Sequence, residues 1–350
     1  MKNFKIGRHE IGLGKSTFLV AEMSGNHGGK IEKAIEIIHA AKAAGADAIK
    51  LQTYTADTIT LKSSKPDFKL PPGPWEDYST LHDLYQEAYT PWEWHEQLFN
   101  EARKIGLDIF SSPFDHTAVD FLEQFNPTVY KLASPEITDI PLIAKMAQTG
   151  KPIIISSGIA TLEDLELAVE TLRANGCDKF IMLKCTTAYP SPLDEVNLRT
   201  MVDMAQKFDC FVGVSDHTLG TTVPLAATTL GASMIEKHFT ITKAEETVDS
   251  FFSLDQEEFS QMVTQVRNVE LCLGKVDYEL SSKAKLNLGG RRSLYISKNM
   301  SKGDIITPQN VRSVRPSHGL HPKYYSQVLG KKVKCDLEIG DRLTLEAIEL

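Results

Sequence analysis

The feature that most constrains the fold of this chain is an eightfold alternation of short apolar segments with amphipathic helical patterns. Apolar runs of five or six residues indicate strands, and apolar residues spaced three and four apart indicate helices. Apolar strands that are each followed by a helix predict a covered parallel sheet, and eight such units predict closure into a (β/α)₈, or TIM, barrel. The expected strands are Phe18–Glu22, Ala48–Gln52, Asp108–Ser112, Val129–Ala133, Pro152–Ser156, Phe180–Cys185, Phe211–Ser215 and Ser233–His238.

One long insertion interrupts this alternation, between Thr53 and Pro91. It follows the second expected strand, on the barrel face where enzymes of this architecture keep their active sites. We therefore expect a lid or a substrate loop, with a structural excursion packed beside the barrel as the alternative. The helices expected elsewhere are Glu32–Ala44, Trp92–Ile105, Thr117–Phe125, Leu162–Ala174, Leu198–Phe208, Val223–Leu230 and Gln256–Cys272.

A second, smaller region follows the barrel. The alternation ends near Gly274, and the remaining sequence consists of short β-like runs and turns such as SKGDIIT and EIGDRLT. We expect a barrel domain over residues 1–274, a linker over 275–289 and a small, mostly β domain over 290–350. A domain of that size has barely enough core to be stable alone.

The charge and the cysteines narrow the class of partner. The formal net charge of −8 disfavours binding to nucleic acid or to an anionic membrane surface. We find no signal-peptide pattern at the N-terminus and no apolar run long enough to span a membrane. The five cysteines are scattered singly, which favours reduced thiols over a disulfide framework. A cytoplasmic enzyme of small molecules is the expectation.

Polar side chains gather at the carboxyl end of every expected strand. Because these ends meet at one mouth of a barrel, they are where such enzymes assemble catalytic groups from distant parts of the sequence. The residues concerned are Glu22, Lys50, Gln52, Ser111, Ser112, Lys131, Ser134, Ser156, Ser157, Lys184, Thr186, Thr187, Ser215, Asp216, His217, Glu236 and His238.

The lysines in this set favour an anion site. Strand alternation puts Lys50 on the same face as Gln52, and a lysine that points into a barrel is costly unless it neutralises an anion. Lys50, Lys131 and Lys184, with the neighbouring hydroxyls, suit a ligand that carries a phosphate and a carboxylate, as phosphoenolpyruvate does. Taken singly, each lysine has the alternative of extending to solvent.

Two histidines suggest a metal site. His217 and His238, in SDHT and EKHF, end neighbouring strands and together can chelate one divalent ion. Two imidazoles without thiolates leave positions for water and substrate, which suits a catalytic Mn²⁺-like ion better than a closed zinc site. A single histidine here would more simply be a hydrogen-bonded rim residue.

Eight segments together resemble the sialic acid synthase family: AEMSGNHGG, AIKLQTY, SSPFD, YKLASPE, ISSG, KCTTAYP, GVSDHT and EKHFT. The tail, RRSLYISKNMSKGDIIT with RPSHGLHPKYY, resembles the antifreeze-like (SAF) domain of that family. The resemblance covers nearly the whole chain. It implies a metal-dependent transferase that forms a carbon–carbon bond between phosphoenolpyruvate and an amino-sugar aldehyde, giving a nonulosonic acid and phosphate.

The resemblance also implies roles for individual residues. His217 and His238 match the ligands of a divalent metal ion (Mn²⁺, Mg²⁺ or Co²⁺), and Glu22 matches the acidic residue beside the metal and the reacting centre. The positions that match contacts to phosphoenolpyruvate are Lys50, Ser112, Lys131, Ser134, Ser156 and Ser215. The positions that match the sugar end are Gln52, Glu136, Thr187, Tyr189, Asp249 and Arg315.

The resemblance implies a homodimer in which the tail domain caps the neighbouring barrel. Arg315 matches an arginine that reaches across to the sugar's N-acetyl region in the partner's site. Each of these residues has a simpler interpretation when taken alone. Tyr189 and Phe252 are ordinary packing residues in that interpretation, and Arg315 is a surface residue in a turn.

Within the family, LQTYTADTITL, YTPWEWH and RPSHGLHPK are most similar to the branch that makes pseudaminic acid from 2,4-diacetamido-2,4,6-trideoxy-L-altrose. The N-acetylneuraminate and legionaminate branches, with the same chemistry, are the alternatives. Thr187 and Lys184 stand where sialic acid synthases typically carry Asn and His, which favours a different sugar. A keto-acid phosphate synthase would need a second phosphate site, and an ice- or glycan-binding protein would leave the charged strand ends unexplained.

Overall fold

A computed structural model describes residues 2–349 of the chain. Its contacts divide the chain into two compact units, Met1–Gly274 and Lys275–Leu350, each with its own hydrophobic core. Within residues 2–349, no helix combines the length and apolar character that crossing a membrane requires.

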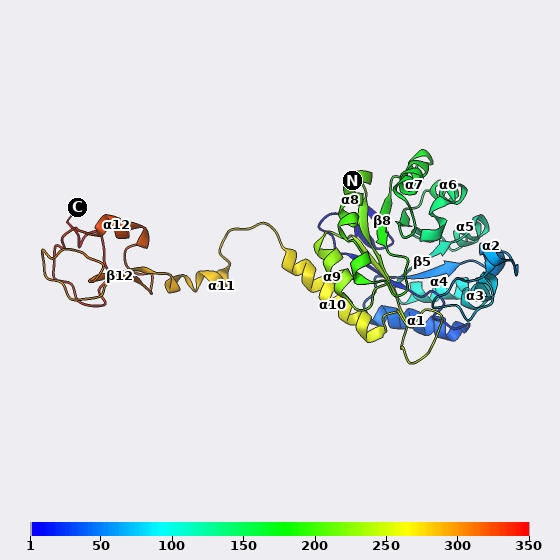
Figure 1. Cartoon of the computed structure of the whole chain (residues 1–350), viewed down its shortest axis with the longest axis horizontal. Helices are drawn as coiled ribbons and strands as arrows, with labels where there is room; N and C mark the ends of the chain where they lie inside the picture. Colours follow the sequence, from blue (N-terminus) through cyan, green and yellow to red (C-terminus); the bar gives the residue numbers. More distant parts are fainter. Residues whose placement is uncertain (1, 350) are drawn as a thin grey trace. The chain divides into compact units, whose positions relative to one another are not determined.

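The first unit is a closed barrel of eight parallel strands, and the predicted fold class is confirmed. The strands follow the order β10-β3-β4-β5-β6-β7-β8-β9 around the barrel, and helices surround them (Figure 1). Each strand lies within one residue of its predicted ends. The bounds are β3 Phe18–Glu22, β4 Ala48–Thr53, β5 Asp108–Pro113, β6 Tyr130–Leu132, β7 Ile153–Ser156, β8 Phe180–Cys185, β9 Phe211–Asp216 and β10 Met234–His238.

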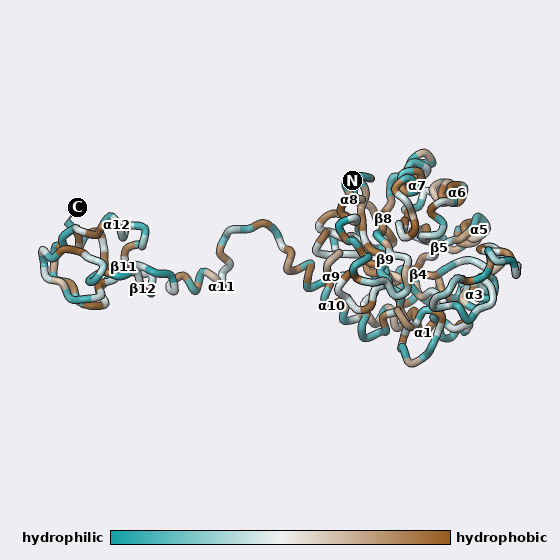
Figure 2. The backbone as a smooth tube through the Cα atoms, in the orientation of Figure 1, coloured by the Kyte–Doolittle hydropathy of each residue, from teal (hydrophilic) through white to brown (hydrophobic). Residues whose placement is uncertain are grey.

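Amphipathic helices cover the barrel, and apolar and polar segments alternate along them (Figure 2). Their buried faces and the outward side chains of the strands make one continuous core. One helix of this layer, α6, was not predicted, although Asp139 caps it by accepting from the Leu142 N–H and Pro141 stands in its first turn. The helices are α1 Ile31–Ala43, α4 His95–Lys104, α5 His116–Glu123, α6 Ile140–Gln148, α7 Leu162–Ala174, α8 Arg199–Phe208, α9 Thr222–Thr229 and α10 Gln256–Leu273.

A second cluster fills the lower half of the barrel interior. It consists of inward side chains such as Val20, Ala48 and Phe110, all fully buried. A hairpin of β1 (Phe4–Ile6) and β2 (His9–Ile11), which was not predicted, adds Phe4, Ile6 and Ile11 to this cluster. The N-terminal end of the barrel is thereby closed with apolar groups.

The insertion after β4 has short elements of its own. It contains α2 (Ala56–Ile59) and α3 (Leu81–Ala88), with a turn of 3₁₀ helix at Pro66–Phe68 between them. Thr55 and Thr80 cap the two α-helices by accepting from backbone N–H groups three residues on.

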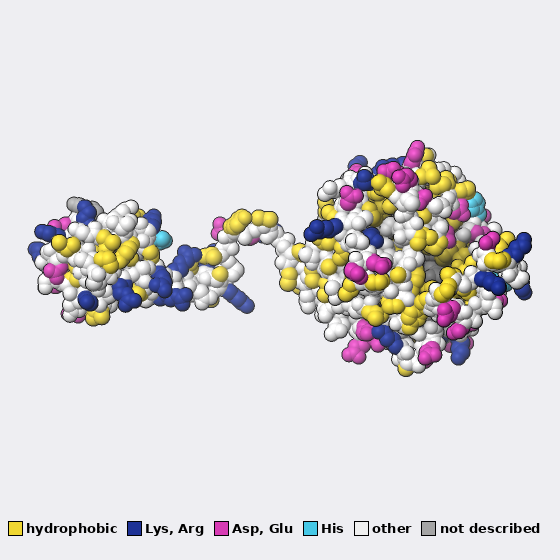
Figure 3. Space-filling model, in the orientation of Figure 1, with side chains coloured by type: hydrophobic (Ala, Val, Ile, Leu, Met, Phe, Trp, Pro, Cys, Tyr) yellow, Lys and Arg dark blue, Asp and Glu magenta, His cyan; other side chains and the backbone are white. Residues whose placement is uncertain are grey.

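The second unit is a small antiparallel structure. Strands β11 (Ser293–Ile296) and β12 (Val311–Val314) pair, and single bridges such as Met300 to Leu337 extend the pairing. Short helices α11 (Ser282–Lys285) and α12 (Tyr325–Val328) complete it, around a core that includes Leu294, Val311 and Val333. Before α11, the segment 275–281 exposes apolar side chains (Figure 3). Val276 is 89% exposed and Tyr278 is 96% exposed.

Candidate active site

The mouth of the barrel is polar on the same inward face that is apolar lower down. Successive side chains of a strand point to opposite faces, so residues two apart share a face. A charged residue follows, two positions further along the strand, each of four members of the lower cluster: Val20, Ala48, Val129 and Met234. The charged residues are Glu22, Lys50, Lys131 and Glu236, and all four are at most 4% exposed.

Those four residues form one ionic network. The ammonium nitrogen Nζ of Lys50 lies 3.0 Å from Oε2 of Glu22 and 3.4 Å from Oε1 of Glu236. Nζ of Lys131 lies 3.3 Å from the same Oε1 of Glu236. The hydroxyl of Ser215 donates to that oxygen at 3.1 Å, and Nζ of Lys50 donates to Oγ of Ser112 at 3.4 Å. At the predicted anion site, the positive charges of Lys50 and Lys131 are thus balanced by the two carboxyl groups of Glu22 and Glu236. Lysines buried this deeply require such counter-charges.

The two carboxyl groups of this network differ in their protonation. Burial raises the pKa of Glu22, and Lys50 only partly offsets that effect. Burial acts on Glu236 in the same direction, but the combined attraction of Lys131 and Lys50 exceeds it and lowers the pKa of Glu236. Glu236 is thus the fixed anion between two lysines, while Glu22 is the group able to take up a proton.

The two predicted metal-binding imidazoles are neighbours. In the register of β9 and β10, Ser215 is beside Glu236 and Asp216 beside Lys237, which brings His217 next to His238. Their ring centres are 5.2 Å apart. Asp216 and Lys237 point to the outer face of the same two strands. Nζ of Lys237 lies 2.7 Å from a carboxylate oxygen of Asp216, and this fully buried ion pair holds the two strands in register.

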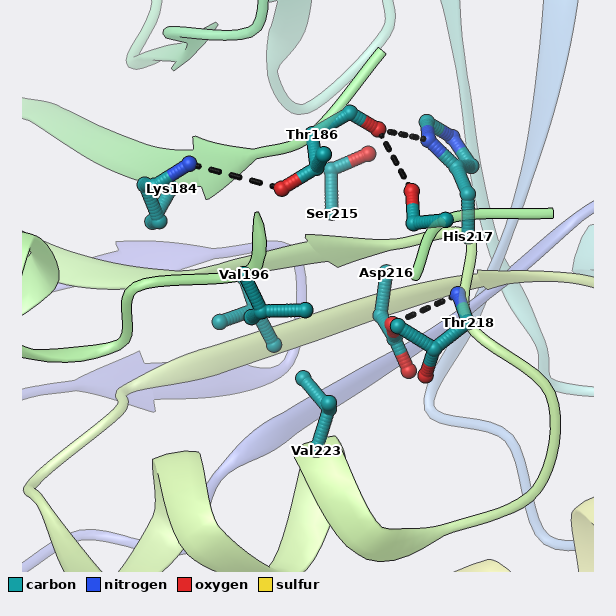
Figure 4. A pocket seen from close by; sticks show the side chains of 10 residues that line it. Lys184, Thr186, Val196, Ser215, Asp216, His217, Thr218 and Val223 are labelled. Atoms are coloured by element: carbon teal, nitrogen blue, oxygen red, sulfur yellow. Dashed lines mark hydrogen bonds between the residues drawn. The ribbon is translucent and has the colours of Figure 1, made fainter. Parts of the chain in front are cut away.

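A backbone carbonyl fixes the orientation of His217. Nδ1 of His217 lies 3.0 Å from the carbonyl oxygen of Thr186, which also accepts from the hydroxyl of Ser191 (Figure 4). Since a carbonyl only accepts, Nδ1 carries the proton, which leaves Nε2 as the ring nitrogen that a metal ion can bind. This arrangement is the usual outer support of a metal-binding histidine.

His238 also suits a metal ion. Burial, reinforced by the nearby cations, lowers the pKa of His238 well below its ordinary value, so the imidazole is neutral. Its Nδ1 lies 3.6 Å from Oδ2 of Asp249, and no residue among 2–349 gives it a hydrogen bond. Across the described chain, no three His, Cys, Asp or Glu side chains gather for a metal, so a two-imidazole seat would leave the remaining coordination to water and substrate.

Polar residues predicted for the sugar lie on one side of this seat. The amide nitrogen of Gln52 donates to Oε1 of Glu22 at 2.8 Å and to Oγ of Ser24 at 3.1 Å. The hydroxyl of Ser24 in turn donates to Oδ2 of Asp249. Glu22, Gln52 and Asp249 are therefore brought together through Ser24, which sequence reasoning missed.

Tyr189 contributes an aromatic ring beside the imidazoles. Its ring centre is 4.5 Å from that of His217 and 5.1 Å from that of Phe252, which is itself 4.6 Å from His238. Tyr189 and Phe252 therefore pack against the two imidazoles. The same position also allows them to lie beside a substrate.

Two more predicted residues, Ser134 and Thr187, lie against Gly158 in the loop after β7. A methyl group built on Gly158 would lie 2.2 Å from the hydroxyl oxygens of both Ser134 and Thr187, so only glycine fits there. The Ser134 hydroxyl accepts from the Ile159 N–H at 2.8 Å. Within residues 2–349 the hydroxyls of Ser156 and Thr187 have no hydrogen-bond partner, which leaves them available to a ligand.

Glu136 follows Ser134 in a 3₁₀ turn and is mostly buried. Burial raises the pKa of Glu136 to about 7. Its Oε2 is a further buried oxygen without a partner in the part of the chain described here. Arg315 belongs to the second unit, where it is exposed directly after β12.

Lys184 does not join the lysines of the mouth. On β8 the inward positions are Ile181, Leu183 and Cys185, so Lys184 points outward, and its Nζ donates to the Cys185 carbonyl at 2.7 Å. The expectation that it faces the anion is wrong. Glu236, by contrast, was noted only as a polar strand end, and its position two residues after Met234 was the signal that it faces the lysines.

Comparison with known proteins decides the family. The model of the NeuB family matches residues 37–278, more than half of the chain. The chain belongs to the NeuB family. The model of the SAF domain matches residues 291–349, so the resemblance of both the barrel and the tail is confirmed.

Individual members of the NeuB family match over nearly their whole length. A pseudaminic acid synthase from Campylobacter jejuni (strain 81-176) is 47% identical over 94% of this chain and 96% of its own. An N,N'-diacetyllegionaminic acid synthase from Legionella pneumophila is 34% identical over 97% and 96%. A crystal structure of N-acetylneuraminic acid synthetase from Leptospira borgpetersenii has a TM-score of 0.72 and 26% identity, covering 82% of this chain and 95% of that one.

Proposed function

We propose that this protein is a pseudaminic acid synthase. It condenses phosphoenolpyruvate with 2,4-diacetamido-2,4,6-trideoxy-L-altrose and water, and releases phosphate. The observation that carries this proposal is the buried network of Lys50, Lys131, Glu22 and Glu236 beside two adjacent imidazoles. It occurs in a chain that is 47% identical to a protein with this name and 34% identical to a legionaminic acid synthase.

Phosphoenolpyruvate would bind above the ionic network. Lys50 and Lys131 supply positive charge, and the hydroxyls of Ser112 and Ser215 already lie within the network. The unpartnered hydroxyl of Ser156 and that of Ser134, beside Gly158, would provide further donors for the phosphate or carboxylate. An anionic ligand is favoured here because Glu22, whose pKa is raised, can take up a proton as the ligand arrives.

The sugar would lie beside the imidazoles. Gln52 and Asp249 offer it hydrogen bonds, and Tyr189 offers an aromatic ring. Thr187 and Glu136 each present a buried oxygen without a partner among the described residues.

We further propose a homodimer in which Arg315 of one subunit reaches the sugar in its partner's barrel. The nearly complete exposure of Val276 and Tyr278 supports this, since exposed apolar segments mark surfaces that a partner covers. Five free cysteines fit a reducing compartment, and we place the enzyme in the cytoplasm.

The chemistry forms one bond and breaks another. The C3 carbon of phosphoenolpyruvate attacks the aldehyde carbon, which leaves positive charge at C2. The aldehyde oxygen, now an alkoxide, takes the proton that Glu22 holds. The resulting Glu22 carboxylate positions a water molecule whose oxygen adds to C2, and it takes up the proton that this water releases. The C2–O bond to phosphate then breaks and the new hydroxyl at C2 gives its proton to the departing phosphate, leaving the keto acid and inorganic phosphate. Lys50 and Lys131 stabilise the negative charge on the departing phosphate.

His217 and His238 would hold a divalent metal ion (Mn²⁺, Mg²⁺ or Co²⁺). The fit rests on the Nδ1 proton of His217, which Thr186 accepts, and on the neutral state of His238. When bound, the metal supplies Lewis-acid polarisation of the sugar's carbonyl oxygen.

A direct assay tests this function. The purified protein is incubated with phosphoenolpyruvate, Mn²⁺ and 2,4-diacetamido-2,4,6-trideoxy-L-altrose while phosphate release is followed, and the product is identified by mass spectrometry. Stoichiometric phosphate and pseudaminic acid are expected, and excess chelator should stop the reaction. Turnover only with N-acetylmannosamine, or only with the legionaminate precursor, would assign the chain to another branch.

A further inference from the structure

An aromatic residue of the insertion crosses the mouth of the barrel. Trp75 belongs to the segment that follows β4, yet its ring centre lies 5.3 Å from that of Tyr189, which follows β8. In the closed order of strands, β4 and β8 stand on opposite sides of the barrel. The insertion therefore spans the opening. The alternative interpretation, in which it packs beside the barrel, is wrong.

Trp75 is held by a hydrogen bond that uses its only polar group. Its indole Nε1–H donates to the carbonyl oxygen of Val248 at 3.0 Å, in the loop after β10. Because indole has no other donor, the ring has only apolar surface left to offer a ligand. The ring is also 6.4 Å from that of Phe251, in the same loop.

These rings continue the aromatic contacts of the metal seat outward. Tyr189 contacts His217, and Trp75 contacts Tyr189 on its outer side. Phe251 contacts Phe252, which contacts His238. Phe251 is 44% exposed, so at the outer end of these contacts part of an apolar ring remains open to a ligand.

We propose that Trp75, Tyr189 and Phe251 form a specificity wall that receives the deoxygenated end of the sugar. This inference rests on the proposed function. With the aldehyde carbon at the imidazoles, the six-carbon chain extends outward along the rings, and its terminal carbon reaches the level of Trp75 and Phe251. In a 6-deoxy sugar that carbon is a methyl group, which the wall can cover without leaving a hydroxyl unpaired.

The wall would act against sugars that carry a hydroxyl at this carbon. A hydroxymethyl group pressed against Trp75 and Phe251 loses its hydrogen bonds to water and gains none from the rings. An apolar pocket rejects an added hydroxyl by at most about 100-fold, so the expected preference is moderate. Gln52 and Asp249, close to the imidazoles, would serve the hydroxyl and acetamido groups that all candidate sugars share.

Two sugars that differ by one oxygen atom test the wall. The values of kcat/KM are measured with saturating phosphoenolpyruvate and Mn²⁺ for 2,4-diacetamido-2,4,6-trideoxy-L-altrose and for its 6-hydroxy counterpart. The wild-type enzyme should prefer the deoxy sugar by roughly 10- to 100-fold. Trp75→Ala and Phe251→Ala should each reduce that ratio to below about fivefold, chiefly through the KM of the deoxy sugar, with the KM of phosphoenolpyruvate unchanged.

The ratio of the two sugars separates recognition from a merely structural role, which would lower both values of kcat/KM equally. Leu61→Ala, at a 65% exposed position of the same insertion, is the matched control and should leave the ratio at its wild-type value. Equal use of both sugars by the wild-type enzyme, or an unchanged ratio in both wall variants, overturns the inference while the proposed function stands. Turnover of neither sugar overturns the proposed function itself.

Discussion

The two halves of the barrel interior are equally buried but chemically opposite. In the lower half the inward side chains are apolar, as with Phe211 at 4% exposure, and the N-terminal hairpin closes them off. Four residues further along the same strand the inward side chain is Ser215, within an ionic network that includes Lys50, also 4% exposed. Burial alone therefore does not separate structural from functional residues, whereas the change of chemistry along one face does.

The halves also differ in what they contribute to stability. Burying apolar side chains stabilises the fold by about 25 cal/mol for each Å² removed from water. Burying charges costs several kcal/mol for each ion, and pairing returns only part of that cost. The buried charges of the upper half, at Lys50, Lys131 and Glu236, therefore lower the stability of the fold but favour the binding of an anion. Such a conflict is typical of active sites.

The sharpest test of the contrast removes an imidazole from the upper half. His217→Ala or His238→Ala should lower kcat/KM by at least about 1,000-fold, equivalent to about 4 kcal/mol, because the metal seat is lost. Mn²⁺ binding, measured by calorimetry, should weaken in parallel, while the circular dichroism spectrum stays unchanged. His39→Ala, on the exposed face of α1, is the control and should keep full activity. Normal turnover in either site variant would remove the metal from the proposal.

A matching test removes a ring from the lower half. Phe211→Ala should cost about 3–4 kcal/mol of unfolding free energy, since it leaves a cavity against Phe4, while kcat changes little. Phe211→Leu keeps most of the volume and should cost less than about 1.5 kcal/mol. All three tryptophans lie before Gly274, so fluorescence during urea denaturation follows the barrel unit alone. If Phe211→Ala abolished activity in the folded state, the two halves would not be separable.

The contrast also explains which parts of the molecule the sequence predicts. All eight strands are predicted to within one residue, because both halves share one signal, an apolar run bounded by turns and helices. The hairpin at Phe4–Ile6 escaped prediction because two strands of three residues are too short to show a period. Helix α6 escaped although its cap was readable at Asp139.

In the site, sequence patterns predict which face a residue occupies better than which residue it contacts. Lys50 and Lys131 were placed correctly in the mouth, but their pairing with Glu236 depends on barrel closure, which brings β10 near β6 across the interior. Lys184 was misplaced because the prediction used only its position near the end of a strand, whereas the inward Ile181 and Leu183 put Lys184 on the opposite face. The position of Trp75 over the mouth depends on the path of a long insertion, which no local pattern specifies.

The smallest effect concerns a single, mostly buried carboxyl just beyond the strand ends of the upper half. Burial raises the pKa of Glu136 from 4.5 to about 7, so the folded protein holds this proton more tightly than the unfolded chain does. The resulting stability is fully present below pH 4.5 and is lost as the pH rises to about 7.

Glu136→Gln should remove that loss. Between pH 5 and pH 8 the unfolding free energy of the wild-type barrel should fall relative to that of Glu136→Gln by on the order of 2 kcal/mol, since one pKa unit corresponds to about 1.4 kcal/mol. Urea denaturation followed by tryptophan fluorescence at both pH values measures the difference, and Glu96→Gln, at an exposed position of α4, is the control. Parallel pH dependence in wild type and Glu136→Gln would mean that Glu136 is solvated in solution. The polar half of the barrel would then contain water beside Glu136.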